Sequence, residues 1–253
     1  MKNTLYIVFL FLIISACKQS KELIFNENFD GNELNMSNWN YELGNGCPNL
    51  CGWGNNERQV YTKENVKVKD GHLIITATKD STGYYSSRIT TKDKVEFQYG
   101  TIEVRAKLAK GYGIWPAIWM LSSEIDSKGW PAAGEIDIME YVGKQPHNIH
   151  TTLHTSDSFG QSKNTKVTVD EAIENGFHIY KANWTEDKIE FFIDENLVYT
   201  FSPEVKDEKT WPFDKPFFII LNVAVGGNFG GPEVDDSIFP EEFVIDYVKV
   251  FKL

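Results

Sequence analysis

Three carboxylates stand within one short segment, residues 134–142 (GEIDIMEYV), at a spacing suited to acid–base chemistry. Alternation along a β-strand places Glu135 and Asp137 on one face and the intervening isoleucines on the other. In an unbroken strand Glu140 would join the isoleucines and bury its charge, which costs several kcal/mol. The pattern therefore predicts a one-residue β-bulge near Met139, which would return Glu140 to the acidic face.

A ridge of three neighbouring carboxylates does not stabilise the fold, because like charges repel. It does shift the pKa values of the three groups. Retaining glycoside hydrolysis needs such a pair. An ionised carboxylate attacks the sugar, and a protonated one about 5–5.5 Å away gives a proton to the leaving oxygen. Carboxylates on one face of a strand fall near that spacing. Taken alone, the segment is equally compatible with a solvated acidic face on an edge strand.

The wider sequence resembles glycoside hydrolase family 16. Residues 130–143 (WPAAGEIDIMEYVG) are similar to the active-site strand of that family. Their Glu-x-Asp-x-x-Glu spacing has one residue more than that of the lichenase branch and resembles the laminarinase branch. Other similar segments follow in order along nearly the whole chain: 38–42 (NWNYE), 52–57 (GWGNNE), 113–121 (GIWPAIWML), 221–228 (LNVAVGGN) and 239–250 (FPEEFVIDYVKV).

The resemblance implies an all-β fold, an antiparallel β-sandwich of the jelly-roll, concanavalin A-like type with a concave substrate cleft. It implies that Glu135 is the nucleophile, Glu140 the general acid/base, and Asp137 the residue that orients the nucleophile. The implied activity is retaining, endo-acting cleavage of β-1,3-glucan or mixed-linkage β-1,3-1,4-glucan. Two alternatives stay open: a hydrolase of a marine galactan, agarase- or carrageenase-like, and a non-catalytic surface glucan-binding protein.

Aromatic and polar side chains around the strand are candidates for sugar binding. Indole rings suit the apolar faces of sugars, and Trp130, close to the catalytic strand, is the foremost candidate. Trp115 comes next, and Trp119 is equally compatible with core packing. The polar candidates are Asn55, Glu57, Arg88 and His154. The resemblance places Asn55 and Arg88 where the family binds sugar hydroxyls, and it matches His154 to a family histidine near the acid/base residue.

No cofactor is expected for catalysis. Three histidines at 147, 150 and 154 lack the His-Glu-x-x-His helix of zinc hydrolases. The resemblance implies a structural calcium ion at Asn28, the Gly71 carbonyl and Asp246. The usual Asp-Glu-Phe of the family reads Glu-Asn-Phe at 27–29, so this calcium site lacks one charge.

The chain has a formal net charge of −11 and no basic stripe. Such a surface repels phosphate backbones, which argues against nucleic acid as a partner and leaves a neutral β-glucan polysaccharide compatible. We expect a monomer.

The N-terminal segment predicts export to the bacterial cell envelope. Lys2 precedes an apolar run at 4–16 that has the length of a signal-peptide core and ends in a lipobox-like ISAC. Lipidation of Cys17 would anchor the protein at the outer membrane or cell surface, its only expected membrane contact; an ordinary cleaved signal and secretion are the alternative. The expected divisions are a lipoprotein-type signal peptide at 1–17, a short tether at 18–23 and one catalytic domain at 24–253.

Short β-branched and aromatic runs between turn residues are typical of a sandwich or barrel. Export also permits a disulfide between Cys47 and Cys51, four residues apart in a loop-like segment. The expected strands are 66–69, 73–77, 100–108, 135–142, 149–154, 177–184, 189–193, 197–201, 217–225 and 243–251, with one helical turn at 170–175.

Overall fold

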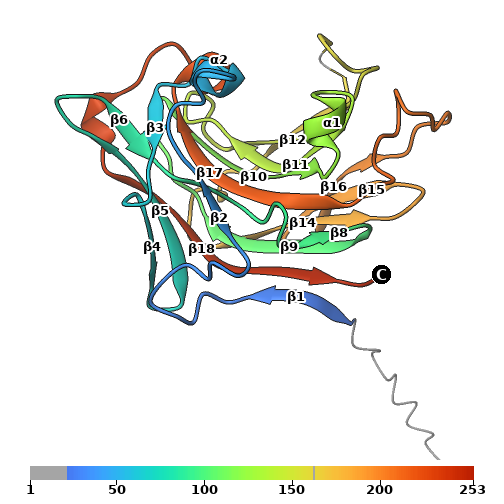
Figure 1. Cartoon of the computed structure of the whole chain (residues 1–253). Helices are drawn as coiled ribbons and strands as arrows, with labels where there is room; N and C mark the ends of the chain where they lie inside the picture. The colour runs from blue at the N-terminus through green and yellow to red at the C-terminus, as the bar shows by residue number, and fades with distance from the viewer. Residues whose placement is uncertain (1–21, 162) are drawn as a thin grey trace, which may run out of the picture.

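The computed structural model describes residues 22–161 and 163–253, so the expected signal peptide and Cys17 lie outside the described residues. Two β-sheets make up almost all of the secondary structure. In Figure 1 the sheet that contains β17, β10 and β11 lies above the one that contains β9 and β18, and both are curved. The all-β sandwich expected from the sequence is confirmed.

The ten-stranded sheet has the order β16-β15-β14-β9-β18-β5-β6-β3, with β1 beside β18 and β4 beside β5. Its pairings are antiparallel except for the parallel pair of β3 with β6. The strand bounds are β1 Leu23–Glu27, β3 Gln59–Tyr61, β4 Val66–Lys69, β5 His72–Lys79, β6 Tyr84–Ser86, β9 Gly100–Lys107, β14 His178–Trp184, β15 Ile189–Ile193, β16 Asn196–Phe201 and β18 Glu241–Phe251.

The eight-stranded sheet carries the carboxylates and has the order β13-β12-β11-β10-β17-β7-β2, with β8 beside β17. In Figure 1 its outward side is concave, with α2 above one end and α1 above the other. We call this side the concave face. The strand bounds are β2 Asn40–Glu42, β7 Arg88–Thr90, β8 Glu96–Phe97, β10 Ile114–Ser122, β11 Glu135–Tyr141, β12 Asn148–His154, β13 Thr165–Val169 and β17 Phe217–Val225.

Helices are short and peripheral in the described ranges. The bounds are η1 Cys51–Gly54, α1 Ile125–Lys128, α2 Gly227–Gly230 and η2 Asp236–Ile238. The helical turn expected at 170–175 is wrong: the chain makes isolated turns there, with the Ile173 amide bonded to Asp170 and the Asn175 amide bonded to Ala172. Neither in residues 22–161 nor in 163–253 does the structure contain a helix with the length and hydrophobicity that a bilayer-spanning segment requires.

The main hydrophobic core fills the space between the two sheets. Alternation along the strands supplies it: Ile118 of β10, Ile136 of β11 and Leu221 of β17 all join this core and are almost fully buried. Strand β17 is buried along all nine residues, because its other side is also covered by side chains of the concave face. A central strand packed on both sides holds β10 and β11 in a fixed register.

Candidate active site

Strand β11 contains the β-bulge that its sequence requires. Against β10, Ile118 faces Met139 but Trp119 faces Asp137, so one residue of β11 has no partner. The pairing with β12 shows the same shift between Asp137 and Glu140. The bulge restores the alternation that the charge pattern demanded, and the three carboxylates lie along one side of the strand.

The glycine before β11 fixes where the strand begins. Gly134 has a φ of +86°, and a Cβ atom there would lie 2.9 Å from the Pro212 ring. Only glycine adopts this conformation at this distance without strain. The approach of Pro212 therefore sets the position of Glu135, the next residue.

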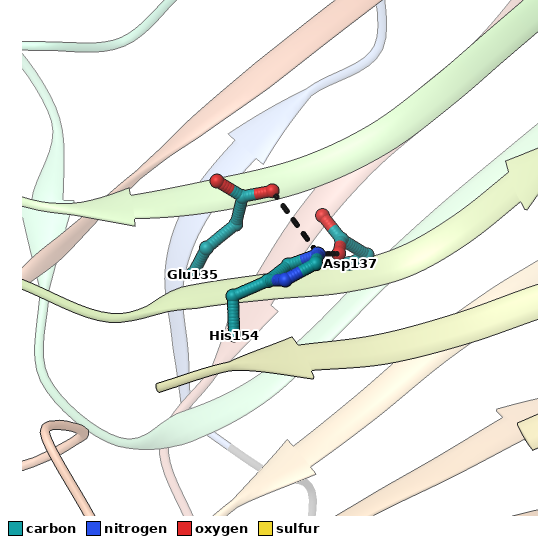
Figure 2. Close-up of side chains that lie close together, drawn as sticks. All are labelled: Glu135, Asp137 and His154. Atoms are coloured by element: carbon teal, nitrogen blue, oxygen red, sulfur yellow. Dashed lines mark ion pairs between the residues drawn. The ribbon is translucent and has the colours of Figure 1, made fainter. Parts of the chain in front are cut away.

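Glu135 and Asp137 share one histidine. His154 Nε2 lies 3.1 Å from Asp137 Oδ2 and 3.7 Å from Glu135 Oε1. Figure 2 shows the imidazole of β12 reaching across to both carboxylates of β11. The Trp130 indole donates a hydrogen bond of 2.9 Å to the other oxygen of Glu135, Oε2. Glu135 is thus held from two sides.

The second glutamate has separate partners. The Trp115 indole donates a hydrogen bond of 3.1 Å to Glu140 Oε1. Phe229 packs edge-on against Trp115, with ring centroids 5.3 Å apart, and also against His150 at 4.9 Å. These contacts fix the indole that orients Glu140.

Burial dominates the proton affinities of this ridge. It raises the pKa of Glu135 to about 8, with the Asp137 charge adding to the rise and His154 opposing it. Burial also raises the pKa of Asp137, opposed by its hydrogen bond with Glu135. Burial, and then the charges of its two acidic neighbours, hold the pKa of Glu140 well above its usual range. Burial therefore favours the protonated form of Glu140, as a general acid requires, whereas His154 and the Trp130 hydrogen bond favour the ionised form of Glu135.

A second group of residues on the concave face surrounds Arg88. Its guanidinium carbon lies 4.5 Å from the ring centroid of Trp53 and 4.7 Å from that of Trp119. Glu42 pairs with the same side chain. Arg88 is only 8% exposed, so it contributes to the site chiefly by fixing the two indoles between which it lies.

A hydrogen-bond chain links this group to the loop at 52–57. Trp119 donates to Asn222 at 2.7 Å, and Asn222 donates to the Tyr61 hydroxyl at 3.1 Å. Tyr61 donates to Glu57 at 3.2 Å, and Glu57 also accepts from Asn55 at 3.2 Å. Burial raises the pKa of Glu57. Asn55 and Glu57 are therefore tied to each other and to the sheet.

A model of glycosyl hydrolases family 16 matches residues 54–249. The β-glucanase of Rhodothermus marinus is 40% identical over 250 residues, covering 91% of this chain and 85% of that protein. The chain belongs to glycosyl hydrolases family 16. The laminarinase of Flavobacterium sp. UMI-01 has a similar structure, with a TM-score of 0.90 and 60% identity over 91% of this chain and all (100%) of that one. The laminarinase catalytic domain of Thermotoga maritima MSB8 matches with a TM-score of 0.85 and 40% identity, covering 93% of this chain and 99% of that one.

The three residues expected to hold a structural calcium ion lie on or beside strands of the ten-stranded sheet. Asn28 follows β1, Gly71 lies in the turn between β4 and β5, and Asp246 is on β18, which pairs with both β1 and β5. Arg105 pairs with the Asp246 carboxylate, so a calcium ion would have to share its one carboxylate with a guanidinium.

The disulfide between Cys47 and Cys51 closes the loop just before η1.

Phe159 is a contact that the sequence pattern did not single out. Its ring centroid lies 5.6 Å from that of Trp130, edge to face, and the two side chains are 62% and 50% exposed. A lone aromatic residue in the Ser- and Gly-rich segment at 156–161 was the available signal. The pair forms an exposed aromatic surface beside Glu135, because Trp130 also bonds to that carboxylate.

We expect Phe159→Ala to raise KM for β-glucan about 3–10-fold and to leave kcat nearly unchanged, because one stacking surface is lost. Initial rates over a range of glucan concentrations measure this effect. Leu197→Ala, at a residue 54% exposed on β16, is the matched control for the loss of an exposed apolar side chain. An unchanged KM in Phe159→Ala would contradict a role in binding.

We expect His154→Gln to move the acid limb of the pH profile to higher pH. The charge of His154 lowers the pKa of Glu135, so its removal raises the pH at which Glu135 ionises. The measurement is kcat/KM against pH. His178→Gln is the control, because His178 on β14 likewise pairs with a carboxylate, that of Asp194 in the turn after β15. A limb that stays in place or moves to lower pH would contradict this assignment.

Proposed function

We propose that this chain is a retaining endo-β-1,3-glucanase in which Glu135 is the nucleophile and Glu140 the general acid/base. The observation that carries the proposal is the bulged strand β11, which brings both glutamates to the concave face with separate partners. One carboxylate is held by Trp130 and His154, and the other by Trp115. Two carboxylates in different surroundings can take different protonation states, as the two roles require.

The proposed reaction has two displacements. In the first, Glu135 bonds to the anomeric carbon, the glycosidic C–O bond breaks, and Glu140 gives its proton to the leaving oxygen. In the second, Glu140 takes a proton from water, the water oxygen bonds to the anomeric carbon, and Glu135 is released. Asp137 is hydrogen-bonded to Glu135 and can hold a proton that Glu135 gives up. No cofactor takes part in either step.

The relatives support a β-1,3-glucan substrate over the alternatives. A β-glucanase and two laminarinases resemble this chain over at least 91% of its length. A non-catalytic glucan-binding protein has no need of the repelling cluster, and all three carboxylates are present here. A sulfated galactan would favour free basic residues near the carboxylates, and Arg88, the basic residue among the binding candidates, is already occupied by Glu42 and two indoles.

The deciding experiment is reducing-end release by the purified protein on laminarin, mixed-linkage barley glucan and agarose, with product lengths resolved. We expect early release of mixed oligosaccharides from laminarin, as internal cleavage requires, and no release from agarose. Glu135→Ser and Glu140→Ala are the inactive controls. Binding of laminarin without release from any of the three polymers would leave a glycan-binding protein instead of a hydrolase.

The setting of the enzyme is also proposed. The lipobox-like ending at Cys17 supports a lipid anchor at the cell envelope, and we propose that the catalytic domain acts as a monomer. Labelling with a radioactive fatty acid, compared between the natural chain and Cys17→Ala, tests the anchor. A structural calcium ion at 28, 71 and 246 stays a prediction, which a melting-temperature comparison with and without a chelator would check.

A further inference from the structure

Three atoms at the active site lie close enough together to be ligands of one metal ion. Oxygen atoms of Glu135 and Asp137 and a ring nitrogen of His154 all lie within 4.8 Å of one another. The nitrogen is 3.1 Å from one oxygen and 3.7 Å from the other. Tetrahedral zinc with bonds of about 2.0–2.2 Å separates its ligand atoms by about 3.3–3.6 Å. Small side-chain movements would therefore bring all three atoms into coordination.

Neither an indole nor a backbone N–H of the described residues donates to the two oxygens that face the imidazole. Trp130 donates its hydrogen bond to Oε2 of Glu135, which leaves Oε1 facing the imidazole. Asp137 is 2% exposed, and its Oδ2 accepts no hydrogen bond although it points at His154. A buried carboxylate oxygen without a hydrogen-bond donor lacks the compensation that such groups normally have. A cation between this oxygen and the imidazole would supply it.

The solvent side of the group is open. The His154 side chain is 36% exposed and that of Glu135 is 15% exposed, whereas Asp137 closes the inner side. Figure 2 shows the three side chains approaching one another from two adjacent strands, with the oxygens of Glu135 and Asp137 on the side of the imidazole. A fourth position facing solvent suits a water molecule, as in three-ligand zinc sites.

We propose that Glu135, Asp137 and His154 form an inhibitory site for a divalent transition-metal ion of the Zn²⁺ or Cu²⁺ class. An imidazole nitrogen among the donors selects such ions over Ca²⁺ and Mg²⁺, which prefer oxygen ligands in larger numbers. The ion inhibits because coordination withdraws Glu135 from attack and occupies the space of the sugar. The inhibitory effect rests on the proposed role of Glu135, whereas binding of the ion does not.

Calorimetric titration of the full chain with Zn²⁺ tests the binding. We expect one ion per chain, and affinity reduced at least about tenfold in His154→Gln. His178→Gln removes another histidine that faces a carboxylate, at 3.0 Å from Asp194, and should leave the affinity unchanged. Near-ultraviolet circular dichroism verifies that both variants are folded. Equal Zn²⁺ affinity in His154→Gln and the natural chain would overturn the proposal.

A second titration tests the competition with substrate. Glu140→Gln keeps the three donors but lacks the proton donor, so laminarin oligosaccharides bind without being cleaved. Saturating Zn²⁺ should weaken oligosaccharide binding at least about tenfold. Independent binding of the ion and the sugar would overturn the inhibitory role. A variant that binds no glucan at all contradicts the proposed function instead, and the His154→Gln comparison still decides the metal site.

Discussion

Glu135→Ser should lose glucan hydrolysis by about 10³–10⁵-fold, and sodium azide should restore turnover of an activated aryl β-glucoside with an α-glucosyl azide as product. The physical reason is geometric. The shortened side chain leaves space on the face of the sugar opposite the leaving group, and the small anion attacks from there in a single displacement. The configuration of the anomeric carbon is then inverted.

Glu140→Ala should also react with azide, but it should give the opposite anomer of the glucosyl azide. The activated leaving group needs no proton, so Glu135 still forms the glycosyl-enzyme, and azide then attacks it without a general base. Two inversions give a β-glucosyl azide. Proton NMR of the two products distinguishes the anomers directly. The same anomer from both variants, or an α product from Glu140→Ala, would contradict the assignment of the two glutamates.

Glu135→Gln should make the protein more stable at neutral and alkaline pH. Burial and Asp137 raise the folded-state pKa of Glu135 from 4.5 to about 8. A carboxyl group with a raised folded pKa contributes its stability fully below the unfolded pKa and loses it as the pH rises through the folded pKa. The natural enzyme therefore loses stability between about pH 4.5 and 8, by up to about 5 kcal/mol if Glu135 acted alone.

Glutamine stays neutral over that range, and its carbonyl can still accept the bond from Trp130. Because neighbouring carboxylates share protons, we expect a gain of about 1–3 kcal/mol at pH 8. This corresponds to a rise in melting temperature of about 3–10 °C for a domain of this size. Calorimetric melts at pH 4, 6 and 8 measure it, with Glu242→Gln, at an exposed position of β18, as the control. A gain that is equal at pH 4 and pH 8 would contradict the linkage.

The two expectations belong together, because the arrangement to which we assign the chemistry is the one that costs stability. A protein that needed strand β11 only for its fold would have no reason to bury three carboxylates side by side. Their retention against this cost is what a catalytic role explains.

Local alternation and the cost of burying charge were enough to predict the acidic face and its bulge. The placement of Glu140 followed from one argument: it could not join the core. The strand lengths also followed closely, as with 217–225, which matches β17. Such predictions succeed where the determining contacts are repeated along a single strand.

The partners of Arg88 could not be predicted in this way. Glu42 and Trp119 lie near Arg88 because β2, β7, β17 and β10 are neighbours in the sheet, and Trp53 is brought to the same side chain by η1. The parallel pairing of β3 with β6 could not be predicted either, because it joins two strands that do not follow each other in the sequence. Periodicity reports which side of a strand is buried, but it carries no information on which distant strand covers it.

The bulge in β11 also decides where this protein can change length. Deleting the unpaired residue at 138 would leave Glu-Ile-Asp-Met-Glu, whose period of two keeps every carboxylate on the same side. Deleting Ile136 would instead turn Glu135 into the core. Loss of one residue from this strand is therefore tolerated at the bulge, at 138 or equally at 139, and we expect lineages that differ there to differ in the bend of the strand while keeping the same chemistry.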